Sequence, residues 1–160
     1  MKNLVRIIIT CSLATLLASI IQACSEEPDC SMTARGWLQC NFYTLSEDGR
    51  AVNDTLDSLT ITAFGTDSVI LNNQKEVRNL MLPLRYTVDS TVLVFRYSRV
   101  TTDTLILYHT NTPYFLSMDC GYQMQQEVTG ARYSRHRLDS IYISYNEAGI
   151  DGRENIKMFY

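Results

Sequence analysis

Residues 92–109 read VLVFRYSRVTTDTLILYH, and this stretch decides the fold class. Side chains that are mostly apolar recur at every second position on both sides of a polar segment: Leu93, Phe95, Tyr97, Leu105, Leu107 and His109. A period of two is the period of a β-strand, because successive side chains of a strand point to opposite faces of its sheet. The stretch therefore predicts two strands joined by a turn, each with one apolar face.

Short alternations of the same kind continue from Gly36 to the last residue of the chain. They comprise Leu38, Cys40 and Phe42; Leu59, Ile61 and Ala63; Val69 to Leu71; Val77 to Leu84; Tyr114, Leu116, Met118 and Cys120; Ile141, Ile143 and Tyr145; and Ile156, Met158 and Tyr160. No window has the i, i+3, i+4 apolar spacing of a helix. About eight or nine short strands are typical of an antiparallel sandwich or barrel. We expect an all-β fold in a single domain over residues 34–160. An antiparallel β-sandwich is preferred to a barrel, because no repeated closing motif of a barrel is present.

The beginning of the chain has a different composition. Lys2 and Arg6 precede a mostly apolar run of 15 residues from Ile7 to Ile21. A membrane-spanning helix needs about 20 residues. A basic start, a short apolar middle and a small residue at the end are instead typical of a secretory signal peptide. We therefore expect residues 1–23 to be removed.

The end of this segment, Ile21-Gln22-Ala23-Cys24, places an aliphatic residue three positions before a cysteine and a small residue directly before it. The pattern resembles the lipobox of bacterial lipoproteins, in which the cysteine thiol is acylated and becomes the new N-terminus. The resemblance implies that Cys24 carries fatty acyl chains, such as palmitate, which anchor the chain to a membrane. An ordinary cleaved signal followed by an unmodified cysteine is the alternative.

Polar and acidic residues follow directly, in the order Ser25-Glu26-Glu27-Pro28-Asp29. A segment of this composition cannot bury apolar surface, so residues 24–33 are expected to form a tether between the lipid and the domain. A short acidic run after a lipidated cysteine also looks like the signal that sends lipoproteins of the Bacteroidetes to the outer face of the outer membrane. A plain solvated linker is the alternative, and the side of the membrane therefore stays open.

The mature chain defined by these predictions has 137 residues and a net charge of −5, because residues 1–23 hold two basic and no acidic residues. One basic concentration runs from Arg132 to Arg137, and we interpret it as a solvated loop or edge strand. A mildly acidic chain of this kind is unsuited to nucleic acid, so no nucleic-acid partner is expected.

Cysteine usage fits an oxidising compartment. Cys11 leaves with the signal and Cys24 is taken by the lipid, so three thiols remain for one bridge and one free cysteine. Cys40 lies on the apolar side of an alternating strand, where a cysteine behaves as a small buried hydrophobe. Cys30 lies just before the domain, and Cys120 stands at a strand end. The pairing Cys30–Cys120 is preferred, and Cys40–Cys120 is the alternative.

Several short motifs occur in a fixed order: the lipobox, a cysteine a few residues later, Leu82-Pro83-Leu84, Asp103-Thr104-Leu105 and Ser117-Met118-Asp119-Cys120-Gly121. In this order they resemble small lipoproteins of the Bacteroidetes that are classed as a domain of unknown function. The resemblance covers nearly the whole mature chain. It implies an envelope location, a β-rich fold and the pairing of Cys30 with Cys120, and it transfers no catalytic residues.

Residue types that carry catalysis occur without the spacing that catalysis requires. His109 and His136 are the two histidines, no serine lies in a G-x-S-x-G elbow, and the glycines form no phosphate loop. The sequence has no CxxC and no cysteine–histidine cluster for zinc, and residues 146–152 miss the spacing of a calcium loop. We therefore expect no enzyme activity, no cofactor and no metal.

Two aromatic residues are candidates for ligand binding. Trp37 and Tyr43 fall on the polar side of the first predicted strand. Exposed aromatic rings on a sheet can stack on sugars or on a partner protein. The alternative is that both faces of that strand are partly covered. We expect a non-enzymatic lipoprotein of the outer membrane that binds another envelope protein or has a structural role, with a glycan-binding accessory module as the second hypothesis.

Overall fold

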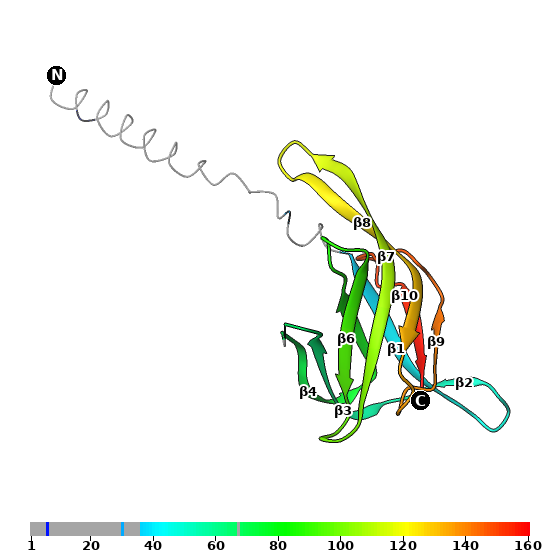
Figure 1. The fold of residues 1–160 in the computed structure, drawn as a ribbon. Coiled ribbons are helices and arrows are strands. Elements are labelled where there is room, and N and C mark those ends of the chain that lie inside the picture. Colours follow the sequence, from blue (N-terminus) through cyan, green and yellow to red (C-terminus); the bar gives the residue numbers. More distant parts are fainter. Residues whose placement is uncertain (1–5, 7–29, 31–35, 67) are drawn as a thin grey trace.

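The computed structural model describes Arg6, Cys30, residues 36–66 and residues 68–160. The predicted signal peptide, apart from Arg6, and the predicted lipidated residue Cys24 lie outside the described residues, as does most of the predicted tether. From Gly36 onward the described chain forms two β-sheets (Figure 1). No helix among the described residues has the length and apolarity needed to cross a membrane.

The first sheet contains both ends of the folded part of the chain. Its strands are β1 (Trp37–Leu45), β2 (Ala51–Asn53), β5 (Asn79–Pro83), β9 (Ser140–Ile143) and β10 (Glu154–Phe159). Their order is β2-β1-β10-β9, and β5 pairs with the first half of β1 on the edge that β2 occupies further along. The last strand therefore lies beside the first. The alternation that ends at Tyr160 predicts a last strand, and β10 confirms it.

The second sheet contains the stretch from which the fold class was predicted. Its strands are β3 (Leu56–Ala63), β4 (Val69–Val77), β6 (Ser90–Arg96), β7 (Thr102–Ser117) and β8 (Gly121–Tyr133), in the order β4-β3-β6-β7-β8. Strands β6 and β7 pair antiparallel, with Leu93 opposite Leu105 and Phe95 opposite Asp103. The predicted pair of strands joined by a turn at 97–101 is confirmed.

The apolar faces of the two sheets form one core. Fully buried side chains come from the alternating positions of both sheets: Leu38, Cys40, Phe42, Ile156 and Met158 from the first, and Leu59, Ile61, Leu93, Phe95, Leu105 and Leu107 from the second. Burying a side chain of this size stabilises the fold by about 1.5–3 kcal/mol. The all-β sandwich predicted from the alternation is confirmed.

Four details differ from the sequence-based prediction. The described residues form ten strands, and β1 and β10 pair parallel, whereas the other named pairs are antiparallel. Strand β7 runs unbroken through Pro113, where the alternation predicts two strands. Pro113 is tolerated because, among the described strands, β8 alone pairs with β7 at this level, so no second ladder requires the missing N–H. Strand β8 was not predicted, because Tyr122 and Met124 are the two apolar side chains between Gly121 and Gln126 and the other side chains there are polar or absent.

Candidate functional site

The most unusual feature of the fold is a hairpin that extends beyond the two sheets. Strand β6 accompanies β7 as far as Tyr108, and the backbone N–H of His109 still donates to Asp89. On the other edge, β8 is bonded to the segment 146–148 up to Gln126. Beyond this level, residues 111–125 pair with each other and with no other strand of the described chain. We call residues 111–125 the hairpin arm, and Figure 1 shows it projecting from the molecule.

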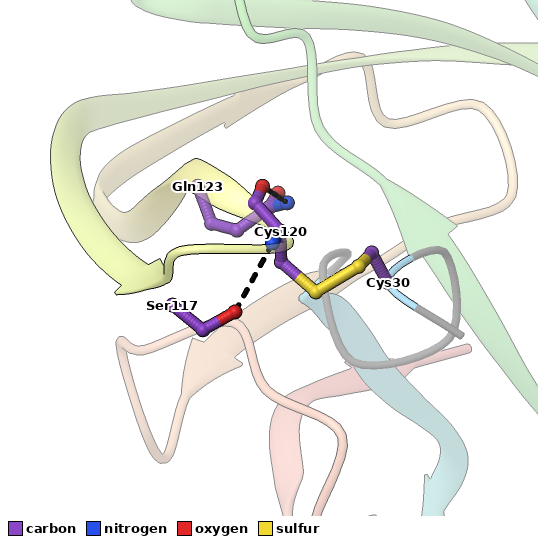
Figure 2. The surroundings of a disulfide bond; sticks show 4 residues. All are labelled: Cys30, Ser117, Cys120 and Gln123. Atoms are coloured by element: carbon purple, nitrogen blue, oxygen red, sulfur yellow. Dashed lines mark hydrogen bonds between the residues drawn. A yellow bond between two sulfur atoms is a disulfide. The ribbon is translucent and has the colours of Figure 1, made fainter. Parts of the chain in front are cut away.

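The tip of the arm carries the disulfide bond. Cys120 is bonded to Cys30, with Cα atoms 5.4 Å apart and a sequence separation of 90 (Figure 2). The backbone N–H of Cys120 donates to the Ser117 hydroxyl at 3.0 Å, and Gly121 adopts the left-handed φ of +67° that closes the turn. An isolated two-stranded hairpin is marginally stable in water. The disulfide therefore holds the tip of the arm to the segment before β1.

The preferred cysteine pairing is confirmed, and the alternative pairing with Cys40 is wrong. Cys40 is a free thiol on β1, fully buried in the core between the sheets. Burial raises the pKa of this thiol, and the nearby carboxylate of Glu154 raises it further. Because thiolate is the reactive form of cysteine, Cys40 is unreactive and acts as a core residue.

Apolar and aromatic side chains cover the arm. The exposed ones are Tyr114, Phe115, Leu116, Met118 and Tyr122. Met118 is 90% exposed and Tyr122 is 75% exposed. The rings of Phe115 and Tyr122 meet edge to face across the two strands, with centroids 5.6 Å apart. One charged side chain, Asp119, lies among residues 111–126.

The alternation predicts that Tyr114, Leu116, Met118 and Cys120 share one face of an ordinary strand. The structure exposes the first three, because the opposite sheet does not extend over the arm. Period-two alternation identifies a strand but does not say whether another sheet covers it. One signal in the sequence was available: the run Tyr114-Phe115-Leu116 is apolar at consecutive positions. Both faces of this segment therefore carry apolar side chains, unlike the faces of a half-buried strand.

The two predicted ligand-stacking residues lie on the outward face of the first sheet, and both are half-buried. The Tyr43 hydroxyl donates to Glu154 at 2.5 Å, and its ring packs against Phe159 and lies under the ammonium group of Lys157. Trp37 and Tyr43 are six positions apart on β1, which corresponds to about 20 Å along a strand. The two rings therefore share a face but do not form one compact site.

Described residues line at least three open cavities, and none of these three gathers a catalytic set. Trp37 borders one of about 170 Å³ with Gly36, Pro83, Leu84 and Tyr86. A second cavity, of about 350 Å³, lies between the arm and residues 147–150, and a third, of about 310 Å³, lies near Phe64 and Arg85. No group of three or more His, Cys, Asp or Glu side chains that could hold a metal ion occurs within the described part of the chain.

His109 lies in a buried polar cluster on the inner face of the second sheet. Its Nε2 atom is 2.9 Å from the hydroxyl oxygen of Thr91, which also accepts the backbone N–H of Arg85. Gln126 donates to the Arg85 carbonyl and to the side chain of Asn111. Burial lowers the pKa of His109, so the ring stays neutral at pH 7. His109 therefore connects β6, β7 and the segment after β5, and it is shielded from any substrate in solution.

The strongest electrostatic feature is a buried carboxylate at the start of β7. Asp103 is 1% exposed and accepts four hydrogen bonds from hydroxyl and backbone donors of the loop between β8 and β9, and its Oδ1 also lies 3.2 Å from Nδ1 of the His136 ring. The Ser134 hydroxyl donates at 2.7 Å, and the backbone N–H groups of His136, Arg137 and Leu138 donate at 2.8, 2.9 and 2.9 Å. Burial alone would raise the pKa of Asp103, but these hydrogen bonds outweigh it and lower the pKa to about 2.

Asp103 thus fixes the loop that contains most of the basic residues from Arg132 to Arg137, for which the sequence predicts a solvated loop or edge strand. The three arginines of that segment are exposed, and Arg135 forms an exposed ion pair with Asp139, whereas the exposed ring of His136 also contacts Asp103. The backbone of the loop, however, is held from inside by the buried carboxylate. The role of Asp103 was missed, although the period-two alternation places it on the same face as Leu105 and Leu107.

The described chain is a two-sheet β-sandwich whose projecting hairpin arm is covalently linked to the segment before β1. The model of the "Family of unknown function (DUF6452)" matches residues 58–160, and the chain belongs to this family. The match begins in β3 and includes Cys120 and Asp103. Comparison with the curated proteins and with the solved structures finds no match. Membership of a family of unknown function, as the motif order implies, is confirmed, whereas the lipoprotein assignment stays a prediction.

Proposed function

We propose that this protein is a lipid-anchored component of the bacterial outer membrane that binds another envelope protein and catalyses no reaction. The observation that carries the proposal is the disulfide between Cys30 and Cys120. Structural disulfides persist in oxidising compartments such as the bacterial envelope. The predicted signal peptide and lipobox direct the chain to that compartment, and Cys30 follows the predicted lipidated residue by six positions.

The positions and hydrogen bonds of the buried polar side chains support a non-enzymatic role. Catalytic acids and bases lie in clefts, where they can reach a substrate. The carboxylate of Asp103 is taken up by four hydrogen bonds from one loop, and the ring of His109 lies inside the sandwich. Both side chains therefore act in holding the fold together.

The outward face of the first sheet is the surface that we assign to the partner. Aromatic and apolar side chains point outward from four adjacent strands of this sheet: Trp37, Tyr43, Met81, Tyr142 and Phe159. Met81 and Tyr142 are more than half exposed. Aromatic residues and Met are enriched at protein interfaces, and Lys157 and Glu154 supply one charge of each sign on the same face.

Site-specific photo-cross-linking in cells tests this assignment. A photoreactive side chain at Tyr142 is expected to give a discrete adduct with one envelope protein, because this position lies on the proposed contact face. The same group at Val100, a fully exposed position in the turn between β6 and β7, is the control and should give no such adduct. Met81→Glu places a charge on the contact face and should abolish the adduct. No adduct from Tyr142, or the same adduct from both positions, would contradict the proposal.

A glycan-binding module is the second candidate, because Trp37 borders a shallow cavity together with Tyr86. Its support is weaker, since a sugar must reach an open ring face and the ring of Tyr43 is already covered by Phe159 and Lys157. The two candidates differ in one outcome. Binding to a glycan panel that is lost in Trp37→Ala, without a protein adduct at Tyr142, would favour the glycan module.

A further inference from the structure

We propose that the tip of the hairpin arm rests in the interfacial layer of the same membrane that holds the lipid anchor. The occupant of this apolar surface is therefore a lipid surface. The inference rests on the proposed anchoring at Cys24. It adds a second membrane contact, made by side chains that lie about 90 residues away from the lipid in the sequence and are brought back to it by the disulfide.

The covalent connections limit how far the arm can be from the membrane. Cys30 follows Cys24 by six positions, and a fully extended chain spans at most about 3.6 Å per residue, which gives an upper limit of about 22 Å between these two residues. Cys30 is bonded directly to Cys120 at the tip of the arm (Figure 2). The Cα atoms of Cys30 and Cys120 are 5.4 Å apart, so the tip is tied to within about 27 Å of the predicted acylated residue.

The opposite end of the molecule is much farther away. Strand β7 has 16 residues and runs from Thr102, next to the turn at Val100, to Ser117, next to the tip. At about 3.3 Å per residue this strand alone is about 50 Å long. The disulfide therefore selects which end of the sandwich approaches the membrane, and that end is the one that carries the arm.

The side chains at the tip suit a membrane interface. Tyr114, Phe115, Leu116, Met118 and Tyr122 are exposed, and Asp119 is the one charge among residues 111–126. Tyr and Trp gather at membrane–water interfaces, where an amphipathic ring contacts both acyl chains and headgroups. No basic residue occurs in this segment, so the contact depends on apolar burial and not on attraction to anionic lipid.

The backbone of the arm sets the depth of the contact. Both outer edges of the two-stranded arm lack a neighbouring strand among the described residues, so their N–H and C=O groups require water or headgroups. Unpaired backbone groups are not tolerated in the hydrocarbon core of a bilayer. The arm therefore lies at the level of the headgroups, with the rings of Phe115 and Tyr122 directed toward the acyl chains.

Quenching of tryptophan fluorescence by brominated lipid tests the inference. The full mature chain, purified with its lipid, is reconstituted in vesicles of phosphatidylethanolamine and phosphatidylglycerol whose acyl chains carry bromine near the headgroup. In a Trp37→Phe background, Tyr122→Trp places a single tryptophan at the tip, and Val100→Trp places it at the opposite end. Both original side chains are largely exposed, so neither change alters the core.

Tyr122→Trp is expected to lose most of its emission in brominated vesicles relative to ordinary vesicles, and Val100→Trp is expected to keep its emission. Equal quenching at both positions, or none at Tyr122→Trp, would overturn the arm contact. Flotation of the vesicles separates the two levels of the proposal. Protein that floats without quenching refutes the arm contact alone, whereas protein that does not float refutes the anchor and the arm contact together.

Discussion

Asp103→Ala is expected to lower the free energy of unfolding by about 3–5 kcal/mol, because it leaves several buried donors without an acceptor. The carboxylate is 1% exposed and accepts one hydroxyl and three backbone N–H groups. Urea unfolding at neutral pH measures the loss. Asp139→Ala is the matched control, since this aspartate lies on the surface in an exposed pair with Arg135 and should cost less than about 1 kcal/mol.

The same carboxylate makes stability depend on pH in a defined window. The pKa of Asp103 falls from its ordinary 3.8 to about 2 on folding, so the folded state holds its proton less tightly than the unfolded state. The resulting stabilisation, about 2 kcal/mol, is fully present above about pH 4 and is lost as the pH falls through about 2. Asp103→Asn removes this titration. A variant whose stability still falls as steeply as that of the original chain between these pH values would contradict the assignment.

The second large effect is expected from the disulfide. Replacing Cys30 and Cys120 together by serine removes a cross-link with a sequence separation of 90, for which chain entropy sets an upper limit of about 4–5 kcal/mol. The hairpin arm should lose stability first, because a two-stranded ribbon without neighbouring strands is marginally stable. Amide hydrogen exchange should therefore speed up at residues 112–125 and stay slow in β3 and β6.

Cys40→Ala is the matched control for the cysteine chemistry. It removes the buried free thiol and leaves the bridge intact, so exchange in the arm should not change. Slow exchange throughout the arm of the chain without the bridge would show that the arm is held by its own strand pairing. In that case the disulfide would not be what positions the tip.

The fold class could be predicted from the sequence, because the alternation of apolar and polar residues indicates which face of a strand is buried. Leu93, Phe95, Leu105 and Leu107 are all buried, as their spacing predicts. This alternation does not indicate which strands pair with each other. Nothing in the alternation indicates that β1 and β10 pair parallel, or that β7 continues through Pro113, because both depend on which neighbours each strand has in space.

Of the candidate site, only the disulfide bond was predictable from the sequence. The preference for Cys30 and Cys120 followed from the apolar surroundings of Cys40, and the structure confirms both the bridge and the buried thiol. The exposure of the arm was not predictable, since it results from the difference in length between the long hairpin and the strands beside it. Asp103 was recorded as part of a motif, but its hydrogen bonds come from a loop about 30 residues further along the chain.

The lipid anchor at Cys24, six positions before the disulfide-bonded Cys30, is the proposal on which the others depend. The most direct measurement is the mass of the N-terminal tryptic peptide of the reduced protein purified from membranes. We expect a peptide of residues 24–35 that begins at Cys24 and carries fatty acyl chains on that residue. A peptide with an unmodified Cys24, or a mature chain that begins at another residue, would contradict the claim.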